Sequence, residues 1–249
     1  MCTVTIFKND NGFRVYMNRD ERFDRDAEAP PQFLNDAKTI IGPFDPVSGG
    51  TWFAVNKSGF WGCLLNGYFE EKQNPTHNGN PKTRGTILLD VLSADDPFAQ
   101  ARAIEYEQYR CFRIIVGSAD ETKLFVWDGD TFKEEPFQQM HDEQVFFMTS
   151  SSLRQDEIVG LRKNMFSKWA KEWDGQDDLP TYHTSQEPSP IEGPLMRREY
   201  ARTTSITALS VSAEGGEMSY WPVPDSGPFT PNFEHALQVF DQKKMRKAV

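Results

Sequence analysis

The sequence contains no long run of apolar residues. Its longest apolar stretches, such as Ile87-Leu88-Leu89, fall far short of the ~20 residues that a membrane-spanning helix needs. The first ten residues, MCTVTIFKND, also lack the basic leader and the sustained apolar segment of an export signal. We therefore expect no integral membrane segment and a cytoplasmic protein.

Cysteine is scarce as well. The three cysteines, Cys2, Cys63 and Cys111, are odd in number and show no CxxC spacing, which argues against a disulfide framework and indicates a reducing compartment. The four histidines are scattered without HxH or HExxH spacing, so we expect no metal site. No glycine-rich phosphate-binding motif follows a strand, and we expect no cofactor.

Positive charge is in deficit. The chain has 27 Lys and Arg against 37 Asp and Glu, which gives a formal net charge of -10. Such a field repels phosphate backbones and anionic lipid surfaces, so we expect no nucleic-acid partner. The 38% of hydrophobic residues and 26% of charged residues are typical of a globular protein, and we expect a single domain over residues 1–249. The oligomeric state stays unknown at this point.

Alternating patterns predict about eight strands, mostly in antiparallel hairpins, and about three helices. TVTIF and FRVYM flank an Asn-Gly turn, and TWFAVN and FWGCLLN flank the turn KSG. Apolar residues from Ile158 to Trp169 recur at spacings of three and four, which predicts a helix. Residues 19–50 are charged and then rich in proline, which predicts a long loop. Two stacked sheets with helices outside fit these elements, and so does a single α+β sheet.

Cys2 becomes an N-terminal cysteine if Met1 is removed, which the small side chain of Cys2 permits. One residue then holds both a thiol, with a pKa near ~8.5, and a free α-amine, with a pKa near ~7.7–8.0. The amine is a base poised close to neutral pH beside a strong nucleophile, and it needs no histidine partner. This pair is the minimal apparatus for acyl transfer.

The first hairpin supplies neighbours for Cys2. With the turn centred on residues 10–11 or 11–12, the apolar faces of both strands coincide when even residues of the first lie opposite odd residues of the second. This register places Cys2 on the same face as Arg19, whose guanidinium would stabilise a thiolate. Asp20 follows and would hold the terminal ammonium. Alternatively, Arg19 and Asp20 form only a salt bridge at the end of a strand.

Several motifs carry a resemblance. MC at the start, NRDE at 18–21, GGTW at 49–52 and LLN at 64–66 resemble the NRDE family, also called the transport and Golgi organisation 2 family. Weaker matches follow in order at TRG (83–85), CFRIIV (111–116) and MTSSSL (148–153). That family is similar to the N-terminal nucleophile (Ntn) hydrolases and akin to choloylglycine hydrolases and penicillin V acylases. The resemblance implies an α+β fold, a four-layer αββα sandwich of two mainly antiparallel sheets.

The resemblance also implies catalytic roles for five residues. Cys2 matches the nucleophile, and Arg19 and Asp20 match the polar pair that holds the thiol and the amine. Asn66 is similar to an asparagine of the oxyanion hole, with the alternative that it only satisfies backbone groups of a turn. Arg202, in YARTTS, is similar to a late arginine of the site.

The chain departs from the family pattern at Ser150. The relatives place a second asparagine there, whereas a serine hydroxyl donates one hydrogen bond and reaches less far than an amide, so we assign Ser150 to substrate binding. The sequence thus predicts an amidohydrolase that cleaves a non-peptide C–N bond of a small acylated substrate. The alternative is a binding or trafficking protein for a hydrophobic ligand (haem, a lipid or an acyl-CoA), because family members are linked to the handling of such molecules. Specificity is expected in loops 21–48, 67–82 and 174–194.

Overall fold

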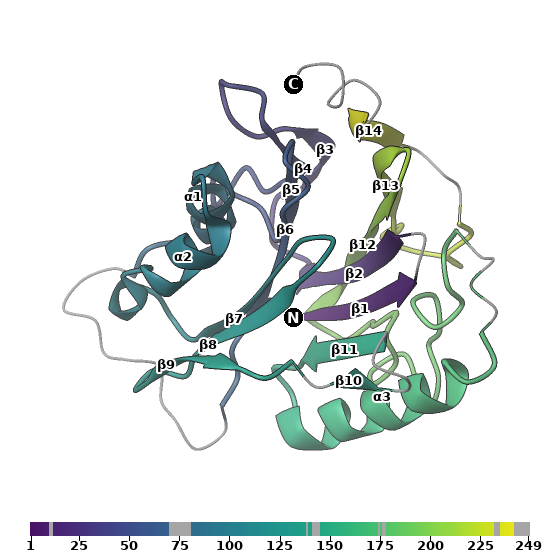
Figure 1. The fold of residues 1–249 in the computed structure, drawn as a ribbon. Helices are drawn as coiled ribbons and strands as arrows, with labels where there is room; N and C mark the ends of the chain where they lie inside the picture. The colour runs from purple at the N-terminus through teal and green to yellow at the C-terminus, as the bar shows by residue number, and fades with distance from the viewer. Residues whose placement is uncertain are drawn as a thin grey trace.

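The chain folds into two seven-stranded sheets that stack face to face (Figure 1). The computed structural model describes residues 1–9, 12–69, 81–137, 139–140, 145–173, 175, 178–231 and 235–241. Neighbouring strands are antiparallel in both sheets. Helices α1 and α2 cover the outer face of one sheet and α3 covers the outer face of the other. The predicted four-layer αββα sandwich is confirmed.

The first sheet contains the N-terminal hairpin in its centre. Its strands, in spatial order, are β10 (Gln139–Met140), β11 (Val145–Ser150), β1 (Cys2–Asn9), β2 (Gly12–Arg22), β12 (Ala201–Ser212), β13 (Gly215–Pro222) and β14 (His235–Asp241). Helix α3 (Gln155–Trp169) lies on its outer face, where the stripe from Ile158 to Trp169 predicted a helix.

The second sheet follows chain order from end to end. Its strands are β3 (Ala29–Phe33), β4 (Ile40–Phe44), β5 (Phe53–Asn56), β6 (Trp61–Asn66), β7 (Phe112–Gly117), β8 (Thr122–Trp127) and β9 (Phe132–Glu135). The helical segments on its outer face are Arg84–Thr86 (3-10), α1 (Ile87–Ser93), α2 (Pro97–Arg102) and Tyr106–Gln108 (3-10). Within the described ranges, no helix is both long and apolar enough to span a bilayer.

The long loop predicted for residues 19–50 is wrong, because strands β3 and β4 lie inside it. Proline is tolerated in β3 because it is an edge strand, where an N–H that faces away from β4 has no ladder partner to lose. The pairing of β3 with β4 also shifts register between Ala29 and Gln32, which takes Pro30 and Pro31 out of the regular ladder. Such short strands raise the observed strand number above the predicted eight.

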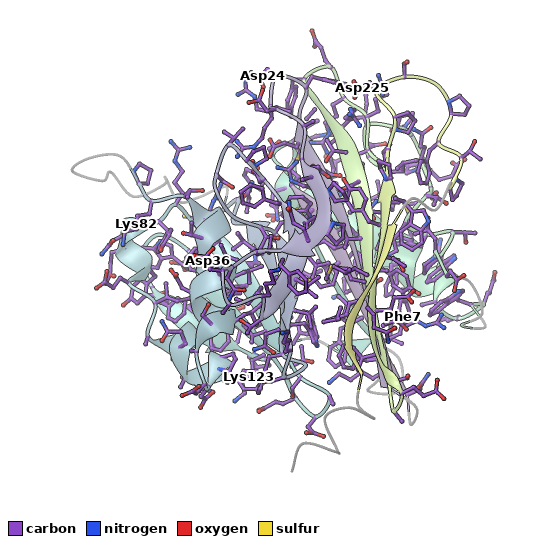
Figure 2. The ribbon with its side chains drawn as sticks, turned by 90° about the horizontal axis from the view of Figure 1, so that it is seen from above. Phe7, Asp24, Asp36, Lys82, Lys123 and Asp225 are labelled. Carbon is purple, nitrogen blue, oxygen red and sulfur yellow. The ribbon has the colours of Figure 1, made fainter. Side chains whose placement is uncertain are left out.

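The predicted pairing of even residues of the first strand with odd residues of the second is confirmed. Val4 lies opposite Met17 and Ile6 opposite Val15, and all four side chains are fully buried between the sheets. The turn itself, at residues 10–11, lies outside the described residues. Side chains from the two sheets fill the space between them (Figure 2). Each large apolar side chain buried there contributes roughly 1.5–3 kcal/mol, which makes the strands a firm support for the residue at the start of β1, Cys2.

Candidate active site

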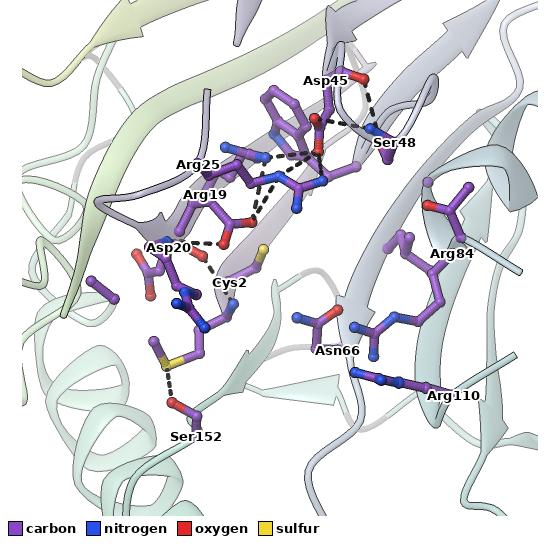
Figure 3. A pocket seen from close by; sticks show the side chains of 18 of the residues that line it. Cys2, Arg19, Asp20, Arg25, Asp45, Ser48, Asn66, Arg84, Arg110 and Ser152 are labelled. Carbon is purple, nitrogen blue, oxygen red and sulfur yellow. Dashed lines mark hydrogen bonds and ion pairs between the residues drawn. The ribbon is translucent and has the colours of Figure 1, made fainter. Parts of the chain in front are cut away.

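A pocket of about 680 Å³ lies where β1 begins and where β2 and β6 end (Figure 3). Its lining combines residues from both sheets, including Cys2 and Arg19 from the first sheet and Asn66 from the second. Most of the lining side chains are charged or polar. The pocket is therefore suited to a small molecule with polar groups.

Cys2 sits between two polar neighbours. It lies opposite Arg19 in the pairing of β1 with β2 and opposite Ser150 in the pairing of β1 with β11. Its backbone N–H donates to Ser150 Oγ at 3.4 Å. Burial raises the pKa of the Cys2 thiol to about 11, against the opposite effects of the Met1 ammonium and of Arg19. At neutral pH the thiol is thus protonated in the chain that carries Met1.

Both the backbone and the side chain of Met1 make contacts that hold it in the lining of this site. Its ammonium donates to the Asp20 carbonyl at 3.0 Å, and its own carbonyl accepts from the Asp20 N–H at 2.9 Å. Its sulfur lies 3.0 Å from Ser152 Oγ and 3.1 Å from Arg198 Nη1. Met1 is only 7% exposed. The folded chain therefore presents little of Met1 to an aminopeptidase.

The Arg19 guanidinium is fixed by carboxylates on three sides. It donates to Glu28, to Asp45 Oδ2 at 3.0 Å and to Glu21 at 3.4 Å. It also lies 4.3 Å from the ring centroid of Trp52, in a cation–π contact. These contacts hold a buried positive charge opposite the thiol of Cys2.

The Asp45 carboxylate connects Arg19 to a second arginine of the pocket lining and to the backbone of its own loop. It also accepts from Arg25 Nη2 at 2.7 Å, and its second oxygen accepts from the backbone N–H of Val47. Burial by itself raises the pKa of Asp45, but the hydrogen bonds from Arg25 and the charge of Arg19 outweigh it and hold this pKa below its ordinary value. The carboxylate is thus ionised at neutral pH.

Asp20 has one carboxylate oxygen engaged and one open. Oδ1 accepts from Thr203 Oγ1 at 2.7 Å. Among the described residues Oδ2 has no hydrogen-bond partner although it is buried, and Arg162 Nη1 is 3.9 Å away. An unsatisfied buried carboxylate oxygen is costly, so it has capacity for a further donor.

The other residues predicted for the site are placed unequally. Asn66, at the end of β6, lines the pocket and donates from Nδ2 to the Tyr68 hydroxyl at 3.3 Å. Ser150 is fully buried beside the backbone of Cys2. Arg202 is not among the described residues of the lining: its guanidinium binds the Val223 carbonyl at 2.7 Å and the carboxylate of Asp225. Cys2, Arg19, Asp20 and Asn66 therefore meet at one pocket, whereas neither Ser150 nor Arg202 is among its described lining residues.

Several residues of the lining and of the charge cluster were not predicted from the sequence. They are Glu28, Asp45, Trp52, Arg84 and Arg110. Trp52 and Arg84 lie inside the motifs GGTW and TRG, which the sequence singled out without a role for them. Asp45 lies in a proline-rich segment that showed no pattern typical of a site, and nothing in the sequence around Glu28 indicates a contact with Arg19.

Two solved structures share this architecture. A Caenorhabditis elegans ortholog of N-acylethanolamine-hydrolyzing acid amidase aligns over 84% of this chain and 92% of its own, with a TM-score of 0.54 and 11% identity. Penicillin V acylase from Agrobacterium tumefaciens aligns over 94% of this chain and 84% of its own, with a TM-score of 0.50 and 12% identity. The chain therefore has the fold of the Ntn hydrolases.

The family is shown by the sequence itself. The sequence model of the Transport and Golgi organisation 2 family matches residues 1–212. This match covers most of the chain, so the chain belongs to that family, as its motifs predicted. Comparison with curated protein sequences gives no significant match.

Proposed function

We propose that the protein is an amidohydrolase whose nucleophile is Cys2, exposed as the terminal residue after removal of Met1. Its substrate is a small acylated molecule with a non-peptide C–N amide bond. The observation that carries this proposal is the position of Cys2, at the start of a central strand and in the lining of the pocket, opposite the fixed guanidinium of Arg19. The fold shared with an N-acylethanolamine-hydrolyzing amidase and a penicillin V acylase supports it.

The proposed reaction starts with a proton transfer inside one residue. After Met1 is removed, the α-amine of Cys2 takes the place of the amide nitrogen beside Ser150. The amine accepts the thiol proton, and the thiolate attacks the substrate carbonyl carbon. The resulting ammonium would donate a hydrogen bond to the open Oδ2 of Asp20. The positive charge of Arg19 favours the thiolate over the thiol.

The second half of the reaction releases both products. Asn66 Nδ2 turns from Tyr68 to the oxyanion of the tetrahedral intermediate. Collapse of this intermediate breaks the C–N bond, and the α-ammonium gives its proton to the departing amine. Water, deprotonated by the same α-amine, then attacks the thioester, which frees the carboxylic acid and restores the thiol.

The test is turnover of a panel of N-acyl amides, with the released amine measured by mass spectrometry. We expect release by the Met1-free protein and none by Cys2→Ala. Cys63→Ala is the matched control, because Cys63 is also a buried thiol in the same core but is not in the pocket lining. Turnover that survives in Cys2→Ala would refute the proposed nucleophile.

One observation favours the second candidate, a binding protein for a hydrophobic ligand. Met1 is seated with its ammonium hydrogen-bonded and buried, and a chain that keeps Met1 has no free amine at Cys2. The intact mass of the protein purified from its native cells separates the two candidates: loss of Met1 supports hydrolysis, and retention of Met1 supports binding.

A further inference from the structure

Two glycine-containing motifs meet beside the pocket and fix one arginine there. Gly50 of GGTW touches Gly85 of TRG so closely that a Cβ on Gly50 would lie 2.2 Å from the Gly85 carbonyl carbon. The Thr51 N–H donates to the Gly85 carbonyl at 2.9 Å, which fastens the two segments together. Arg84, the central residue of TRG, is thereby held in the pocket lining, on the side of β6 and away from Arg19.

The described residues orient the Arg84 guanidinium but do not neutralise it. Nη1 donates to the Cys111 carbonyl at 2.8 Å, and the other N–H groups make no hydrogen bond to a described residue. Arg110 lies next to it in the same lining, and Figure 3 shows both guanidinium groups gathered near Asn66. Burial is the main cause that lowers the pKa of Arg84, and the like charge of Arg110 also lowers it, while Tyr68, Cys111 and Glu21 act in the opposite direction without reversing the shift. Two adjacent guanidinium groups, one of them partly desolvated, repel each other.

The two sides of the pocket differ in charge balance. Arg19 and Arg25 are matched by Glu21, Glu28 and Asp45. In contrast, no carboxylate of the described residues is within ion-pair distance of Arg84 or Arg110. A local excess of positive charge is unexpected in a chain with a net charge of -10. An anion between the two guanidinium groups would relieve their repulsion and take up their free donors.

We propose that Arg84 and Arg110 form a subsite for a carboxylate or phosphate group at one end of the substrate. The identification of this anion as part of a substrate rests on the proposed hydrolysis, whereas the binding of an anion by the two arginines does not. The substrate would place its amide beside Cys2 and Asn66, and its anionic group against the two arginines. The substrate class is therefore a small N-acyl amide that carries an acidic group.

Binding can be measured without turnover. The Cys2→Ala protein is titrated by calorimetry with glutarate, with its uncharged isostere glutaramide and with inorganic phosphate. We expect an anion to bind and glutaramide not to bind, and the stronger of the two anions identifies the acidic group. Loss of one charge-assisted hydrogen bond corresponds to roughly a tenfold to hundredfold weakening, which we expect in Arg84→Gln and in Arg110→Gln.

Arg102→Gln is the matched control, because Arg102 is an exposed arginine that pairs with Glu134 outside the pocket. It should bind the anion like its parent. Arg110 is exposed, so its variant folds even if Arg84→Gln does not. Equal binding of glutarate and glutaramide, no binding of either anion, or unchanged binding in both pocket variants would each overturn the subsite.

A second experiment measures turnover. Amides with the same acyl group and with either an acidic or a neutral amine are compared by kcat/KM, and the ratio of acidic to neutral substrate should fall in both pocket variants. A ratio that stays at its wild-type value would overturn the subsite. If the anion binds selectively but no amide is cleaved, the subsite stands and the proposed hydrolysis fails.

Discussion

Replacing Arg19 by Gln tests the charge cluster that supports Cys2. The side chains of Arg19, Glu28 and Asp45 are only 6%, 7% and 9% exposed. The variant leaves these two buried carboxylates with one fewer cation, and Glu28 then has no ion-pair partner among the described residues. Removing one partner of a buried ion pair costs about 3–5 kcal/mol of unfolding free energy, because the remaining charge stays desolvated.

For a chain of this length, each kcal/mol lowers Tm by ~2–4 °C, so we expect a Tm lower by about 6–20 °C in Arg19→Gln. The loss should also depend on pH. The pKa of Asp45 is held below its ordinary value in the folded protein, so its stabilisation is present above pH ~3.9 and is lost as the pH falls further. In the variant, protonation of the uncompensated carboxylates becomes easier, and its deficit should shrink towards acidic pH.

The assay is urea denaturation of both proteins at neutral pH and at about pH 3.5, below the ordinary pKa of Asp. Arg22→Gln, in the same strand, is the control: the pair of Arg22 with Asp24 is largely exposed, and we expect no measurable loss. A loss below about 1 kcal/mol in Arg19→Gln, or one as small as in Arg22→Gln, would refute the claim that this cluster is a firm support.

Three further predictions concern single groups. With a thiol pKa of about 11, alkylation of Cys2 in the Met1-bearing chain should be slow at pH 7 and rise about tenfold per pH unit; equal rates with and without Met1, measured by peptide mass spectrometry, would contradict this. Burial lowers the pKa of His183 from 6.5 to about 3. The unfolded chain therefore binds the extra proton, and the unfolding free energy should fall by up to ~1.4 kcal/mol per unit as the pH drops below ~6.5; in urea denaturation His183→Gln should lack this contribution to the slope. Asn66→Ala should lower kcat by ~10²–10³ with little change in KM, and a change in KM alone would exclude an oxyanion role.

The local part of the site could be predicted from the sequence. The apolar faces of Val4 and Ile6 match those of Val15 and Met17 in either register that the turn allows, and both place Cys2 on the same face as Arg19; the structure has the register in which the two residues are opposite. Only two strands close in sequence are needed for that inference. Asn66, by contrast, was expected in the site only because its motif LLN resembles the family pattern, and it ends strand β6.

The distant part of the site depends on tertiary structure that sequence patterns do not encode. Glu28 reaches Arg19 only because the segment after β2 crosses to the second sheet, where it begins β3. The place of Arg202 depends on how β12 pairs with β2 across about 180 residues of chain, with a register shift between Thr203 and Ser205. That irregularity leaves no trace in the alternation of apolar residues.

The central claim is that Cys2 is a nucleophile once its amine is free. The most direct measurement is the mass of the Met1-free protein after brief reaction with an activated N-acyl amide, followed by peptide mapping. We expect one acyl group on the Cys2 sulfur, none in the chain that retains Met1, and discharge of the adduct in water. An adduct elsewhere, or equal labelling of both forms, would contradict this claim.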